Sequence, residues 1–142
     1  MAIEFSSKSA TYSEFSNFHS APFVVDGQTW PTVEHFFQAA KFPGDPLQEQ
    51  IRIAKTPQQA KKLGRTRTPA FRPDWETIKE SIMETALKAK FTQHPALTQL
   101  LKSTGQAELR EKAFWDSYWG TGRNGQGRNR MGYLLQTLRN NL

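Results

Sequence analysis

The feature that most constrains the fold is a long amphipathic segment between Asp74 and Gln93. Apolar side chains recur along it at helical spacing, at Trp75, Ile78, Ile82, Ala86 and Ala89. A stripe with this period predicts one continuous helix whose apolar side faces a core. A helix of this length needs partners along its whole apolar face, so we expect the remaining elements to pack around it.

Shorter segments predict further helices and little sheet. The dipeptide Asp26-Gly27 separates two extended runs and predicts a hairpin over 22–30, because these residues adopt the positive φ angles of a tight turn. Caps and breakers predict the other helices, which are expected over 31–42, 47–55, 56–64, 95–104 and from 129 toward the C-terminus. Pro31 is expected at the first helical position. The segment 107–114 fits either helix or strand, and we favour a short strand.

Length and composition indicate the class of protein. The chain has 142 residues, which predicts a single domain over residues 1–142 with room for a core. Hydrophobic residues are 37% and aromatic residues 12%, so aromatic rings are expected to fill much of that core. The expected fold class is mainly α, a compact domain with a short β-hairpin and minor strands.

Charge and cysteine content limit the function. Nineteen Lys and Arg against thirteen Asp and Glu give a formal charge of +6, which favours a partner that carries phosphate. Without cysteine the chain has no disulfide, thiolate metal site or catalytic thiol. No signal peptide and no membrane-spanning stretch is recognisable, so we expect a cytoplasmic protein with no membrane partner.

Three polar residues follow one line of the first predicted helix. Glu34, Gln38 and Lys41 are spaced i, i+4 and i+7, so they stack on one side of it. A line of this kind is either ordinary solvated surface or the wall of a cleft in which chemistry takes place. The residues alone leave both interpretations open.

Metal and dinucleotide sites are not predicted. His19, His35 and His94 lack paired spacing, and the sequence after Glu34-His35 lacks the second histidine of a zinc-protease helix. The run GTGRNG at 120–125 matches a dinucleotide fingerprint in form only, because no β-α-β unit surrounds it. We therefore expect no metal and no cofactor.

The same glycine loop fits a phosphate. It carries Arg123, Arg128 and Arg130 and enters a helix for which Asn129 is the expected cap, so free N–H groups and guanidinium groups are predicted to cradle an anion. A mobile, solubilising loop is the alternative, and the spacing does not choose between these two interpretations.

Asp116 comes just before the loop, beside Tyr118-Trp119. It is either an acid with a raised pKa or a turn aspartate that accepts backbone N–H bonds.

These residues together suit chemistry at a sugar carbon. Two carboxylates manage proton transfer and oxocarbenium charge, and a lysine forms an imine with an opened ribose.

The segments that carry these residues also resemble a known family. The segments 14–18, 26–42, 60–65, 72–91 and 116–135 are similar to the motifs of the YbiA/NADAR family, in the same order. The resemblance implies a mainly helical fold and N-glycosidase activity on ribose joined to an exocyclic amine.

The resemblance also implies roles for individual residues. It places Glu34, Asp116 and Trp75 in the catalytic set, with Lys41 as our candidate for the imine. The remaining expected contacts are with substrate, through Asn17, Trp30, Gln38, Trp119 and Gly120, and with its phosphate, through Arg65, Arg123, Arg128 and Asn129. The chain departs from the family pattern at Ala113, where relatives carry a hydroxyl group.

Three functions follow from this reading. The first is hydrolysis of a phosphorylated ribosyl-heterocycle of riboflavin biosynthesis, which releases ribose 5-phosphate. The second is removal of ADP-ribose from guanine in DNA or RNA, for which the basic run from Lys61 to Arg72 would contact the backbone. The third, from another class, is a nucleotide or nucleic-acid binding module without turnover.

Overall fold

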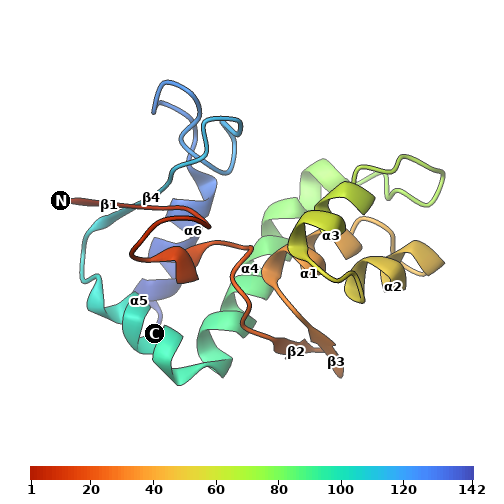
Figure 1. Ribbon diagram of the computed structural model, residues 1–142, viewed down its shortest axis with the longest axis horizontal. Coiled ribbons are helices and arrows are strands. Elements are labelled where there is room, and N and C mark those ends of the chain that lie inside the picture. The colour runs from red at the N-terminus through yellow and green to blue at the C-terminus, as the bar shows by residue number, and fades with distance from the viewer. The chain divides into compact units, whose positions relative to one another are not determined.

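The computed structural model describes all residues, 1–142, as two compact units (Figure 1). Unit 1 comprises residues 1–19 and 94–142, and unit 2 comprises residues 20–93. Six α-helices and four short strands make up the two units. The predicted class, mainly α with a hairpin and minor strands, is confirmed. None of the helices has the length and apolarity that crossing a membrane requires.

Unit 2 contains the hairpin and four helices. In chain order these are β2 (Phe23–Val25), β3 (Gln28–Trp30), α1 (Val33–Ala39), α2 (Pro46–Arg52), α3 (Pro57–Leu63) and α4 (Trp75–Gln93). Helix α1 lies among the other three helices and packs against each of them (Figure 1). It is therefore buried on most sides, and the long helix α4 covers one of them.

The hairpin forms as the sequence predicts. Asp26 and Gly27 adopt φ angles of 51° and 78°, and β2 pairs antiparallel with β3. At the end of α4, the Gln93 side chain accepts a hydrogen bond from the Val24 N–H at 2.8 Å and donates one to the Val24 carbonyl at 2.8 Å. This pair of bonds fixes the outer edge of β2 to the long helix.

Helix α1 begins two residues later than predicted. Thr32 is its N-cap, with the hydroxyl accepting the His35 N–H at 3.2 Å, so Pro31 precedes the cap and is not the first helical residue. The His35 ring lies buried between the Thr32 hydroxyl and the Ala54 carbonyl, at 2.8 and 3.0 Å. Burial lowers the pKa of His35, and the bond to Ala54 opposes that shift. The neutral ring therefore ties the start of α1 to the chain after α2.

The ends of the next helices follow from proline. Helix α2 stops at Arg52, short of the predicted end at Lys55, while α3 matches its prediction. Thr56 precedes Pro57 and is extended, with its hydroxyl capping α3 through the Gln59 N–H at 3.1 Å. A residue before proline avoids helical angles, so the chain needs a few non-helical residues between α2 and α3.

Unit 1 combines a parallel strand pair with two helices. Its elements are β1 (Ala2–Phe5), the 3-10 turn η1 (Ser13–Phe15), α5 (Pro95–Ser103), β4 (Glu108–Glu111) and α6 (Arg130–Asn140). Strand β4 confirms the strand favoured for 107–114. Strand β1 was not predicted, although Ile3 and Phe5 alternate as buried residues with exposed neighbours. Four residues give too short a pattern, and its parallel partner β4 is distant in sequence.

Asn129 ties β4 to α6. It occupies the N-cap position with φ 51°, but its side chain does not cap the helix. Its Oδ1 accepts the Glu111 N–H at 3.0 Å, and its Nδ2 donates to the Leu109 carbonyl at 2.8 Å. The predicted side-chain cap is therefore wrong. The amide instead completes the hydrogen bonds of a strand that has a partner strand on one edge only.

Replacing Asn129 should destabilise unit 1. In Asn129→Ala a buried carbonyl and a partly buried N–H group lose their partner, and alanine takes a left-handed φ, so we expect the free energy of unfolding to fall by about 2–3 kcal/mol. The matched control is Asn124→Ala in the exposed part of the same loop, with an expected change below about 0.5 kcal/mol. Urea denaturation measures both, and equal effects would contradict the role of Asn129.

Candidate active site

The polar line on α1 is buried. Glu34, Gln38 and Lys41 are only 7%, 6% and 8% exposed. Within the line, the Gln38 Nε2 donates a hydrogen bond of 2.6 Å to the Glu34 Oε2. A solvated helix face would leave these groups in water, so the first of the two interpretations from the sequence does not hold. Burying a carboxylate, an amide and an amine costs free energy, which makes this line a candidate functional site.

Lys41 lies at the end of this line, among aromatic rings. Its Nζ donates to the Gly64 carbonyl at 3.4 Å and lies 5.6 Å from the centre of the Trp75 ring and 5.8 Å from that of Phe37. The two rings meet edge to face, with their centres 4.9 Å apart. Trp75 thus lies beside the line, and Phe37 forms a second aromatic wall next to it.

The surroundings lower the pKa of Lys41 to about 8. Burial is the largest cause, because it disfavours the charged ammonium, and the positive charge of Arg67 is the second. The Glu34 carboxylate acts in the opposite direction. An amine with this pKa is partly neutral near physiological pH, and the neutral form is the one that attacks a carbonyl or an imine.

Gly64 and Arg67 belong to the site and were missed from the sequence. A Cβ on Gly64 would overlap the Gln38 amide oxygen, so only glycine leaves room for that side chain. The Gly64 carbonyl accepts from Lys41 and also from the Arg67 Nη1, at 2.9 Å. In the sequence Gly64 showed only as the end of a helix. Its second role depends on α3 packing against α1, which no local pattern reveals.

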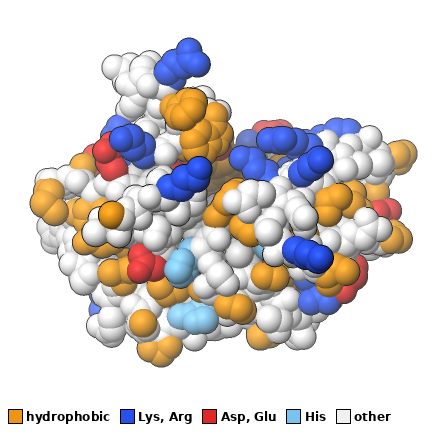
Figure 2. Space-filling view, in the orientation of Figure 1, with side chains coloured by type: hydrophobic (Ala, Val, Ile, Leu, Met, Phe, Trp, Pro, Cys, Tyr) orange, Lys and Arg blue, Asp and Glu red, His pale blue; other side chains and the backbone are white.

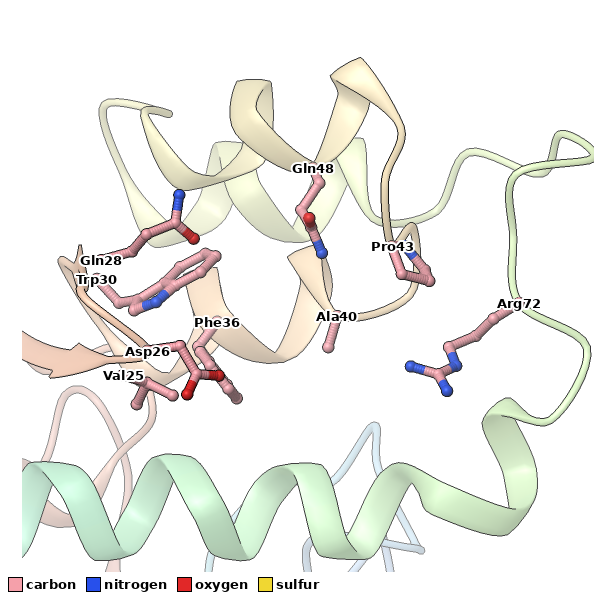
Figure 3. Close-up of a pocket in the computed structure, with 9 residues that line it drawn as sticks. All are labelled: Val25, Asp26, Gln28, Trp30, Phe36, Ala40, Pro43, Gln48 and Arg72. Atoms are coloured by element: carbon pink, nitrogen blue, oxygen red, sulfur yellow. The ribbon is translucent and has the colours of Figure 1, made fainter.

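Trp30 lies on a different face of α1. It lines a pocket of about 250 Å³ together with Phe36 and Ala40 (Figure 3). Phe36 and Ala40 are about half a turn away from Glu34 and Gln38 around the helix. The structure therefore separates Trp30 from the polar line with which it was grouped.

Asp116 in unit 1 is a turn aspartate. Its Oδ1 accepts the N–H groups of Tyr118 and Trp119, at 3.0 and 2.9 Å. The Tyr118 and Trp119 rings meet edge to face, with centres 4.9 Å apart. Of the two interpretations left open, the structure shows the satisfied turn, in which the two backbone N–H groups fix the orientation of the carboxylate.

The prediction that the glycine loop binds a phosphate is partly wrong. The N–H groups of Asn129, Arg130 and Met131 donate to the carbonyls of Gly120, Tyr118 and Trp119, each at 3.0 Å. The start of α6 is thus occupied by the chain itself, and the prediction of free N–H groups there is wrong. Two predicted phosphate ligands remain accessible on the loop, since Arg123 and Arg128 are exposed. The Arg128 guanidinium lies 4.6 Å from the centre of the Tyr118 ring.

The other predicted residues are distributed between the units. Gly120 is packed so closely that a Cβ would lie 2.9 Å from the Ala113 side chain, and Asn17 is buried in unit 1. Arg65 is exposed in unit 2, where basic side chains gather over α3 and the loop after it (Figure 2). Unit 2 therefore brings together Glu34, Gln38, Lys41 and Trp75, and unit 1 holds Asp116, Trp119, Gly120, Arg123, Arg128 and Asn129 around one loop.

A buried carboxylate, amide and amine beside an indole make this line the candidate active site, and comparisons with known proteins give the class of the protein. The NADAR domain model matches residues 4–142. The chain therefore belongs to the NADAR family. It is 49% identical over 140 residues to N-glycosidase YbiA of Escherichia coli (strain K12), covering 99% of this chain and 88% of that protein.

Two further similarities agree with this family assignment. The NMR structure of E. coli YbiA superposes with a TM-score of 0.90 at 48% identity, covering 99% of this chain and 84% of that one. The chloroplastic riboflavin biosynthesis protein PYRR of Zea mays is 42% identical over 147 residues, covering 92% of this chain and 23% of that protein. These comparisons confirm the expected class, an N-glycosidase, and disfavour the alternative of a binding module without turnover.

The pKa of Lys41 gives a direct test of the site. We expect the Lys41 amine to titrate near pH 8, against an ordinary value of 10.5. In Arg67→Gln the pKa should rise, because a neighbouring positive charge is gone. Arg65→Gln is the control, with a smaller rise expected since its influence ranks below that of Arg67. Carbon-13 NMR of the lysine Cε resonances measures each titration. A wild-type Lys41 that titrates with the exposed lysines would contradict the assignment.

Proposed function

We propose that the protein hydrolyses the C–N bond between ribose and the exocyclic amine of a heterocycle, in a phosphorylated intermediate of riboflavin biosynthesis. The products are ribose 5-phosphate and a heterocyclic amine. The observation that carries the proposal is the buried line of Glu34, Gln38 and Lys41 beside Trp75. The riboflavin biosynthesis protein among the relatives supports the choice of substrate.

The chemistry of a ribosylamine explains why a lysine is useful. The sugar ring opens to an imine between C1′ and the heterocyclic nitrogen. The neutral Lys41 amine then adds to C1′ and loses a proton, while the heterocyclic amine gains a proton and leaves. This exchange forms a Lys41 imine with ribose phosphate. Water adds to that imine and releases the aldehyde form of ribose 5-phosphate, which restores the amine.

Proton transfer in these steps falls to the carboxylates. Glu34 takes the proton from Lys41 and later activates water, with the Gln38 amide holding its orientation. For Asp116 the family resemblance implies the companion role, protonation of the leaving amine or stabilisation of charge at the sugar. Trp75 stacks on the heterocycle. For Arg123 and Arg128, whose guanidinium groups are exposed, the family resemblance implies binding of the phosphate. No metal or cofactor is needed at any step.

A second candidate within the class is removal of ADP-ribose from guanine in nucleic acid. Phe114 and Trp115 favour it, because both residues are 64% exposed in unit 1 and their rings meet edge to face with centres 5.0 Å apart. Exposed aromatic rings near basic side chains stack on unpaired bases. Assaying both substrates side by side distinguishes the candidates, and hydrolysis of the ADP-ribosylated nucleic acid alone would replace our proposal.

Substitution of Glu34 tests the acid–base role. We expect Glu34→Gln to lower kcat by at least about 100-fold, because the amide cannot accept a proton. The control is Glu84→Gln, which removes an exposed acid from the same unit that is not among the charges acting on Lys41, and it should leave kcat unchanged. Release of ribose 5-phosphate is measured by mass spectrometry. A folded Glu34→Gln enzyme with wild-type kcat would rule out the role of Glu34.

A reductive trap tests the imine. Borohydride added during turnover should reduce the Lys41 imine to a stable secondary amine, and peptide mass spectrometry should find ribose phosphate on Lys41. Trapping should increase as the pH rises through about 8, where the amine becomes neutral. Lys41→Arg should give no adduct, whereas Lys62→Arg on the exposed side of α3 should trap normally. Hydrolysis by wild type without any adduct would argue for direct attack by water.

A further inference from the structure

The pocket on the far side of α1 has no role in the reaction above. Its volume is about 250 Å³, and every residue that lines it belongs to unit 2. Figure 3 shows Phe36 of α1 and Ala40, the residue after the helix, as its inner wall, with Trp30 on one side and Pro43 on the other. The polar line of Glu34 and Gln38 points away from it, so the pocket is separate from the candidate active site.

Two aromatic rings form a corner of this pocket. The Trp30 and Phe36 rings are almost perpendicular, at 84°, with centres 5.1 Å apart. A flat ring placed against one of them meets the other edge to face, and both arrangements are favourable between aromatic rings. The corner therefore suits a planar aromatic group better than a flexible chain or a sugar.

Polar groups around the corner define what that ring must carry. The Arg72 guanidinium points toward Ala40 from one side, and Asp26 lies on the other (Figure 3). The Gln48 amide nitrogen donates to the Ala39 carbonyl at 3.0 Å, which fixes that side chain and leaves its oxygen as an acceptor. The Trp30 indole N–H is buried without a partner, an uncommon state for a donor.

The charges around the pocket disfavour an anion. Arg72 forms a two-point pair with Asp74, through Nε at 2.7 Å and Nη2 at 3.1 Å, so its positive charge is already matched. Asp26 adds a negative charge to the lining. The remaining Arg72 Nη1 suits a carbonyl oxygen, while Asp26 and Gln48 suit amino groups. A phosphate would meet repulsion from Asp26 with no free cation to offset it.

We propose that this pocket, which Trp30, Phe36, Asp26 and Arg72 define, binds an uncharged planar heterocycle that carries both amino and oxo groups. The ring lies in the Trp30–Phe36 corner, the oxo group accepts from Arg72, and amino groups donate to Asp26 and Gln48. This is a second site, on the opposite face of α1 from Glu34. It selects a free heterocycle and rejects its ribose phosphate derivative, and it does not depend on the proposed function.

The four tryptophan indoles give a direct measurement. In nitrogen-15 NMR each indole N–H has its own resonance, and Trp30→Phe identifies that of Trp30. The probe is 2,4-diamino-6-hydroxypyrimidine, a planar ring with the required groups. We expect it to shift the Trp30 resonance saturably and to leave that of Trp115, which lies in unit 1, in place. Inorganic phosphate should leave Trp30 unaffected.

Two variants test the geometry. Ala40→Met fills the pocket and should abolish the Trp30 shift, whereas Ala70→Met, at a half-buried position of the same unit outside the pocket, should not. Arg72→Gln should raise the dissociation constant about tenfold, as expected for one lost charge-assisted hydrogen bond. If Ala40→Met disturbs the fold, an altered Trp75 resonance would reveal it. The dissociation constant of the probe for Arg72→Gln then tests the proposal.

The outcomes separate this proposal from the proposed function. Glu34→Gln should bind the probe as wild type does, because Glu34 faces the other side of α1. A probe that shifts Trp75 and not Trp30, or that binds Arg72→Gln as well as wild type, would overturn the second site and leave the hydrolase proposal intact. A saturable Trp30 shift in a protein that hydrolyses neither candidate substrate would support the second site and overturn the hydrolase proposal.

Discussion

The hydrogen bond between Gln38 and Glu34 is the interaction on which the site depends. Helix α1 is enclosed by three other helices, so any polar group on its inner faces loses water on folding. The 2.6 Å bond offsets part of that cost for Glu34 and fixes the carboxylate. Gly64 makes the arrangement possible, because it alone leaves room for the amide. The packing of α3 on α1 therefore determines where the acid points.

Much of the fold follows from local signals. The hairpin at Asp26-Gly27, the cap at Thr56 and the length of α4 could be predicted because turn chemistry, capping and apolar period act over a few residues. Strand β1 could not, since a parallel pair forms between distant segments and four residues carry little pattern. The start of α1 was misplaced because proline fits the residues just before a cap as well as the first turn.

The candidate site was predictable in its residue types and less so in its contacts. Spacing placed Glu34, Gln38 and Lys41 on one line, and only the resemblance favoured a cleft over solvent. Loop 117–131 shows where such reasoning fails. Glycines and arginines indicated open N–H groups at α6, yet the preceding turn supplies the carbonyls that occupy them. Whether a helix start is free depends on the path of the chain before it, which composition does not describe.

The chemistry assigned to Lys41 has a cost for folding. Its pKa is about 8 in the folded chain and near 10.5 when solvated, so below pH 8 the ammonium is held where it is disfavoured. That contribution destabilises the folded state at neutral pH and is relieved as the pH rises from about 8 toward 10.5, where the unfolded chain binds more protons. Arg67 increases the penalty and Glu34 reduces it. The chain thus keeps its amine close to neutrality mainly by burying it and also by placing a cation beside it, and the nearby carboxylate limits what this costs in stability.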